Sequence, residues 1–135
     1  MNVSRTRKLA IALLLASVAS ASPAAAASAP PVDGHWQGKT AQGLPIFFGV
    51  RAGSVVNVRW FADLGLCGRQ EVRYPHAVIL LGESGRFEET FEGEIRIEGT
   101  FASARRAHGE VIFPKTTGLP GCPPKTITFH AVPRR

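Results

Sequence analysis

Residues 86–101 restrict the possible folds more than any other part of the chain. Apolar side chains and glycines occupy most odd positions of this run, and charged residues and threonines occupy the even ones. This period of two is typical of a β-strand with one face on a core and the other in water. Sixteen extended residues would span about 50 Å, against a radius of gyration near 13 Å for a compact domain of this size. The run therefore has to turn or bend.

The turn is expected at Gly93. A two-residue connection at positions 92 and 93 would place Phe91 opposite Glu94 and would move Ile95 to the wrong face. A three-residue connection instead places Phe91 opposite Ile95 and keeps the parity. We therefore expect a three-residue turn or a kink at Gly93.

The two faces of the run have different expected roles. Gly93 and Gly99 share the inward parity, so the sheet should bend there and another backbone should come close. The outward residues Glu94, Arg96 and Glu98 alternate in sign. They predict a solvated, self-paired ladder that discourages edge-to-edge aggregation.

Several further segments read as short strands. The pattern predicts them at residues 35–39, 44–50, 54–61, 77–81, 108–114 and 126–132. Tyr74-Pro75-His76 is expected to break any strand that precedes it, and 77–81 to form a short buried strand. Residues 115–124 hold two glycines and three prolines and predict a loop. The fold class is all-β: an antiparallel β-sandwich or small barrel of about seven to nine short strands with one disulfide.

The first 29 residues predict an export signal. Arg5, Arg7 and Lys8 form a basic start, residues 9–18 form an apolar run too short to span a bilayer, and Ala-x-Ala sites follow. A retained amphipathic or membrane-anchoring helix is the alternative. We therefore divide the chain into a signal peptide and small-residue linker at 1–29 and one secreted or periplasmic β-domain at 30–135, with no membrane span after cleavage.

Charge argues against a nucleic-acid partner. The full chain carries a formal charge of +6, of which three positive residues belong to the signal, so the domain holds 13 basic and 10 acidic residues. Its arginines are spread singly among glutamates rather than gathered in one basic patch, apart from the pairs 105–106 and 134–135. No nucleic-acid partner is expected.

The two cysteines, Cys67 and Cys122, both belong to the domain. In an oxidising compartment they are expected to form a disulfide, which would join two Gly/Pro-containing loops at one end of the fold. A thiol nucleophile or a metal site is the alternative, but neither cysteine has a second cysteine or a histidine at ligand spacing.

Several short motifs, taken in order along the chain, resemble the pattern of a known group of proteins. Gly38-Lys39-Thr40-Ala41-Gln42-Gly43 comes first, and Cys122 precedes Phe129-His130-Ala131 at the end. This ordered set resembles a group of small secreted bacterial β-proteins, largely uncharacterised, with a Gly-x-Thr-x-x-Gly start and a Cys…Phe-x-Ala end. The resemblance implies a β-fold and export and implies no catalytic residue. Phe129 stands where tryptophan is common in that pattern.

Glu89 breaks the inward parity of residues 86–101, between Phe87 and Phe91. A buried carboxylate could serve as an acid catalyst, whereas an edge or bulged strand would let it reach water or an arginine, and the second interpretation is preferred. The histidines lie on separate elements without ligand spacing, so no metal and no cofactor is expected; they are His35, His76, His108 and His130.

Three aromatic residues are candidates for ligand binding. Trp36, Trp60 and Tyr74 could form a platform for sugar rings, although large aromatics in so small a domain are more often core. We therefore expect a non-enzymatic domain that binds an extracellular or envelope protein or glycan through loops at one end, with Trp36, Trp60, Tyr74 and Glu89 as candidate binding residues. A small hydrolase or inhibitor-like protein that uses Glu89 or a histidine is the alternative.

Overall fold

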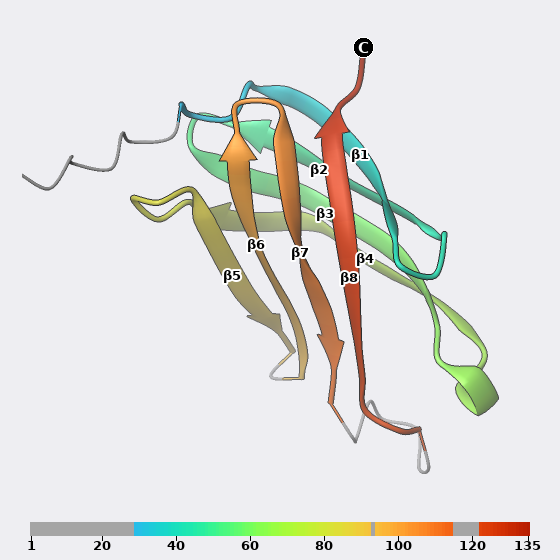
Figure 1. Ribbon diagram of the computed structural model, residues 1–135. Helices are drawn as coiled ribbons and strands as arrows, with labels where there is room; N and C mark the ends of the chain where they lie inside the picture. Colours follow the sequence, from blue (N-terminus) through green and yellow to red (C-terminus); the bar gives the residue numbers. More distant parts are fainter. Residues whose placement is uncertain (1–28, 93, 115–121) are drawn as a thin grey trace, which may run out of the picture.

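The structure is a computed structural model that describes residues 29–92, 94–114 and 122–135, and it is all-β (Figure 1). Within these ranges the only helical element is the short 3-10 helix η1, Gly65–Cys67. The eight strands fall within the expected seven to nine and confirm the fold class. They are β1 Gly34–Thr40, β2 Pro45–Arg51, β3 Ser54–Asp63, β4 Arg69–Leu80, β5 Arg86–Phe91, β6 Ile95–Ser103, β7 Arg106–Phe113 and β8 Lys125–Pro133.

All eight strands belong to one antiparallel sheet in the order β4-β3-β2-β1-β8-β7-β6-β5. The last strand, β8, lies between β1 and β7, so it joins the N-terminal hairpins to the later ones. The sheet curls into a nearly closed barrel, with β4 and β5 as its two margins (Figure 1). Of the two architectures left open by the sequence, the barrel is therefore the one observed.

The expected turn after Phe91 is confirmed. Phe91 pairs with Ile95 across β5 and β6, which leaves three residues in the connection. Gly93 itself lies outside the described residues. Gly99 is a site of close approach as expected, because a Cβ there would lie 2.5 Å from Cζ of Phe87 and 3.0 Å from the carbonyl oxygen of His108.

The outward face of β5 and β6 carries the expected charged ladder. Arg96 donates to Glu88 and lies 2.8 Å from both Glu88 Oε2 and Glu98 Oε2. The hydrogen bond to Glu88, followed by the charges of Glu88 and Glu98, raises the pKa of Arg96. Glu94 lies in the turn and makes no ion pair with another described residue, so the self-paired ladder is built from Glu88 instead.

Strand β4 corrects two predictions. It runs without a break through Tyr74, Pro75 and His76, where the sequence predicted an interruption. Proline is tolerated because β4 is a margin of the sheet and its register with β3 shifts there, between Val56 and Val58. The run at 77–81 is also not a buried strand, because Val78 is 63% and Leu80 76% exposed.

Aromatic rings from both halves of the sheet meet inside the barrel. Trp36 of β1 stacks on Phe48 of β2 with centroids 5.8 Å apart, and it meets Phe101 of β6 edge-on at 5.1 Å. Its indole nitrogen donates a hydrogen bond of 3.0 Å to the carbonyl oxygen of Val32. Trp36 and Trp60 are 1% and 0% exposed, as the core interpretation of the tryptophans expects.

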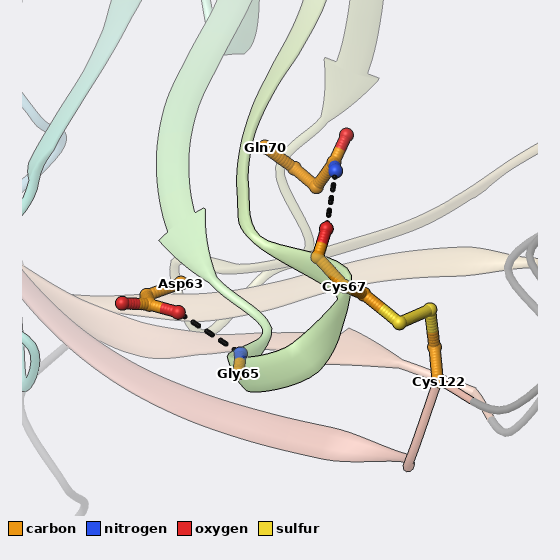
Figure 2. The surroundings of a disulfide bond; sticks show 5 residues. All are labelled: Asp63, Gly65, Cys67, Gln70 and Cys122. Carbon is orange, nitrogen blue, oxygen red and sulfur yellow. Dashed lines mark hydrogen bonds between the residues drawn. A yellow bond between two sulfur atoms is a disulfide. The ribbon is translucent and has the colours of Figure 1, made fainter.

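The disulfide between Cys67 and Cys122 is present and joins η1 to the residues that precede β8 (Figure 2). Hydrogen bonds fix the η1 loop: the amide of Gly65 donates to Asp63 Oδ1 at 2.9 Å, and Gln70 Nε2 donates to the carbonyl oxygen of Cys67 at 2.9 Å. A disulfide is typical of oxidising compartments outside the cytoplasm. The described part of the chain contains no helix that is long and apolar enough to cross a membrane. The predicted signal peptide lies almost wholly outside the described residues.

Candidate functional site

The two margins of the sheet face each other without forming a ladder. β4 and β5 follow one another in the chain, joined by residues 81–85, yet they stand at opposite ends of the strand order. Their outer edges therefore keep backbone N–H and C=O groups that no described strand pairs with. We refer to the region between these two margins as the seam.

Aromatic side chains fill part of the seam. Tyr74 of β4 stacks on Phe91 of β5, with ring centroids 3.8 Å apart and planes inclined by 12°. Trp60 lies beneath this pair, 6.2 Å from Tyr74 and 6.4 Å from Phe91 between centroids. Its indole nitrogen is buried and has no hydrogen-bond partner among the described residues. The seam is thus held by ring contacts rather than by backbone hydrogen bonds.

A cleft of about 280 Å³ opens at the seam, near the disulfide-bonded end. Apolar groups from four strands or loops form its floor, and four polar or charged side chains surround its mouth. The lining residues are Leu64, Val72, Tyr74, Ile95 and Phe113, together with the polar Gln70, Glu71, Arg73 and Glu92.

Tyr74 is the candidate binding residue that the structure places in this cleft. Burial raises the pKa of its phenol above the ordinary value of 10.0, and the charges of Glu92 and Glu94 raise it further. The neutral, hydrogen-bonding form of the phenol therefore persists at alkaline pH. The turn after β5 supplies both carboxylates, so the site depends on the three-residue connection.

This pKa gives a direct test, because Tyr74 is the only tyrosine of the chain. We expect phenolate formation, followed by ultraviolet absorbance, at a pH above 10.0 in the folded protein and near 10.0 in urea. The folded protein then holds its proton where the unfolded chain has lost it, so stability falls as the pH rises past about 10.

A paired substitution isolates the part of the pKa shift that the two carboxylates cause, while burial, the largest cause, remains. The double change Glu92→Gln and Glu94→Gln should lower the pKa of Tyr74 toward the urea value, whereas Glu110→Gln, on β7, should leave it unchanged. A folded-state titration at or below 10.0 would contradict the assigned environment.

The other candidates are placed elsewhere. Trp36 and Trp60 are buried, so neither ring is accessible to a ligand in this structure. Glu89 is half-buried on β5 opposite Ile97; it does not line the cleft and makes no ion pair with another described residue. Glu89 therefore shares the inward face of β5 with Phe87 and Phe91, but the strand is a margin of the sheet and the carboxylate stays partly exposed to water.

The histidines do not assemble into a site. All four are exposed, and the two that come closest are His108 and His130, whose ring centroids are 6.4 Å apart. The described residues hold no group of three histidine, cysteine, aspartate or glutamate side chains with metal-binding geometry.

Loops at the disulfide-bonded end meet one another beside Leu64, which lines the seam cleft. Gln42 in the connection between β1 and β2 exchanges two hydrogen bonds of 2.8 Å with the backbone of Asp63 at the end of β3. The ammonium group of Lys125 also reaches the carbonyl oxygen of Asp63, at 3.1 Å. Leu66 in η1 is fully exposed. These contacts give the end of the barrel a fixed shape around one projecting apolar side chain.

Sequence reasoning missed the seam because it depends on which strands fail to pair. The available signal was Pro75, which is typical of a sheet margin. Comparison with known proteins adds nothing to the assignment, since no family model, curated protein or solved structure matches the chain.

Proposed function

We propose that this chain is an exported, non-enzymatic binding domain that holds an extended segment of an extracellular or envelope protein along the free edge of β4. The observation that carries the proposal is the seam, where two sheet margins leave backbone groups unpaired beside an apolar cleft. Addition of a strand to such an edge is a common mode of peptide recognition, with backbone hydrogen bonds for affinity and side-chain pockets for specificity.

The side chains near β4 favour a polypeptide over a neutral glycan. Val78 and Leu80 are exposed on the same strand and would pack against apolar side chains of an added strand. Aromatic platforms for sugar rings are less available, because both tryptophans are buried and Tyr74 already stacks on Phe91. Arg73 and Glu92 at the mouth of the cleft supply one charge of each sign for selectivity.

The hydrolase alternative has no specific observation in its favour. Glu89 lies away from the cleft lining, and the histidines are exposed on separate strands of the described chain. Binding therefore remains the function that this geometry supports best.

Site-specific photocrosslinking in the secreting cell tests the proposal. We expect Gln70→p-benzoylphenylalanine, at the cleft, to yield an adduct with a defined protein, and the matched Thr128→p-benzoylphenylalanine on the exposed face of β8 to yield none. A synthetic peptide that covers the crosslinked segment should then slow hydrogen exchange of amides in residues 69–74. Adducts of equal yield from both positions, no adduct from position 70, or a peptide that leaves these amides unchanged would contradict it.

A further inference from the structure

A second concave surface lies on the outer face of the sheet, across β2, β3 and β4. Phe47 pairs in register with Arg59, and Arg59 pairs with Arg73, so these three side chains lie side by side on the face away from the core. Arg134, just beyond β8, reaches the same surface. The groove has a volume of about 500 Å³ and is lined by Phe47, Asn57, Val58, Arg59, Arg73, Pro75 and Arg134.

Arg59 is held in place before any ligand arrives. Its guanidinium lies 5.0 Å from the centroid of the Phe61 ring and 6.0 Å from that of Phe47. Its Nε donates to Glu71 Oε1 at 2.8 Å, and this is the only hydrogen bond that the guanidinium makes to another described residue. The Nη atoms therefore remain free to donate to a ligand, from a side chain whose rotamer freedom is already restricted.

The other two arginines carry charge that no described carboxylate neutralises. Arg73 and Arg134 are exposed and make no ion pair with another residue of the described ranges. Only Arg59 has an acidic partner, so the lining of the groove has a net positive charge.

The strand order also gathers most basic residues on the side of the sheet that contains the groove. The five neighbouring strands β4, β3, β2, β1 and β8, with residues 29–81 and 122–135, hold eight Lys and Arg against three Asp and Glu. Residues 82–114, which contain β5, β6 and β7, hold four Lys and Arg against seven Asp and Glu. One side of the barrel therefore attracts anions and the other repels them.

We propose that this groove binds an acidic oligosaccharide whose sugars carry carboxylate or sulfate groups. Guanidinium groups suit such oxyanions because they donate two parallel hydrogen bonds. Pro75 and the exposed part of the half-buried Phe47 offer apolar surface to sugar C–H faces, and Asn57 offers an amide to hydroxyl groups. The volume falls within the usual range for small-ligand sites rather than that of a polymer track.

Single-stranded nucleic acid fits the same groove less well. Its usual anchor is base stacking on open aromatic faces, whereas Arg59 already lies over both Phe47 and Phe61. Nucleic acid is therefore an outcome of the test that would overturn the assignment.

Calorimetric titration provides the test, with four probes of similar size: a galacturonate tetramer, a heparin-derived tetrasaccharide, maltotetraose and a short oligothymidylate. We expect at least one acidic oligosaccharide to bind and maltotetraose not to bind. The double variant Arg73→Gln and Arg134→Gln should weaken that binding at least about tenfold, because two charge-assisted hydrogen bonds are lost.

Matched variants separate a site from general electrostatics. The double change Arg105→Gln and Arg106→Gln removes the same charge from the turn before β7 and the first residue of that strand, and it should leave affinity within about twofold. Arg73→Lys keeps the charge without the planar fork and should fall between wild type and Arg73→Gln. The single variant Arg134→Gln tests this groove alone, since Arg73 also borders the seam cleft.

The contrary outcomes are distinct. No binding of either acidic oligosaccharide, equal weakening by both double variants, or tighter binding of oligothymidylate would each overturn the proposal. Loss of oligosaccharide binding in Arg134→Gln should leave the seam crosslink from position 70 unaffected, so the two proposals fail independently.

Discussion

Loss of the disulfide between Cys67 and Cys122 is expected to lower the free energy of unfolding by about 4 kcal/mol. The bond closes a loop with a sequence separation of 55 residues, and the chain-entropy model assigns this cost mainly to the wider freedom of the unfolded chain. In the folded state, η1 and the residues before β8 would also lose their only covalent link. The free energy of unfolding of a typical domain is only about 5–15 kcal/mol, so a loss of this size is a large fraction of it.

Urea titration of the double variant Cys67→Ala and Cys122→Ala, followed by circular dichroism, measures this effect. Wild-type protein in the presence and absence of dithiothreitol is the matched control, and its reduced form should lose a similar amount of stability. A loss below about 1 kcal/mol in both experiments would contradict the expectation. If strands β5 to β7 kept their structure while the region around η1 unfolded at lower urea concentration, the bond would act locally.

Trp36→Ala is expected to cost about 3–5 kcal/mol, the usual range for removal of a large buried aromatic side chain. Trp36 is 1% exposed and contacts Phe48 from the N-terminal hairpins and Phe101 from the later ones. Its removal leaves a cavity at the point where the two halves of the barrel pack together. The hydrogen bond from its indole nitrogen to Val32 is lost as well.

Thermal and denaturant unfolding of Trp36→Ala measures the cost, with Val132→Ala as the control. Val132 pairs with the next residue, Gln37, but is 48% exposed, so its truncation should change stability by less than about 0.5 kcal/mol. Similar losses from the two variants would show that Trp36 does not anchor the core. Loss of cooperativity in Trp36→Ala alone would instead strengthen the view that it joins the halves.

Much of the fold could be predicted because it rests on local pattern and on one covalent link. The alternation at residues 86–101 predicted β-structure that turns or bends, and the parity argument favoured a three-residue turn or a kink at Gly93; the structure has the three-residue connection that places Phe91 opposite Ile95. The pairing of the cysteines followed from their number and the expected compartment. The alternation and the turn depend on neighbours in the chain, and two cysteines allow only one pairing within it, so the sequence contains this information.

The errors lie at the margin of the sheet. Tyr74-Pro75-His76 was expected to end a strand, yet β4 continues through it because a margin strand needs no hydrogen bond from proline on its free side. The apolar run at 77–81 was expected to form a buried strand because it is continuous, yet Val78 and Leu80 are exposed, since the burial of a strand depends on its neighbours. No local sequence pattern indicates that β4 and β5 do not pair with each other through backbone hydrogen bonds.

The sequence by itself determined most of the β-strands and the turn after Phe91, because period and parity act over a few residues, and it determined the disulfide, because the chain has two cysteines. Only the tertiary structure decided the strand order, which places β8 beside β1 and brings Arg134 to the groove that contains Arg59 and Arg73. It also placed most basic residues on one side of the barrel and left the seam open. Both results come from pairings between distant segments, whose free energy depends on the whole core rather than on any one stretch.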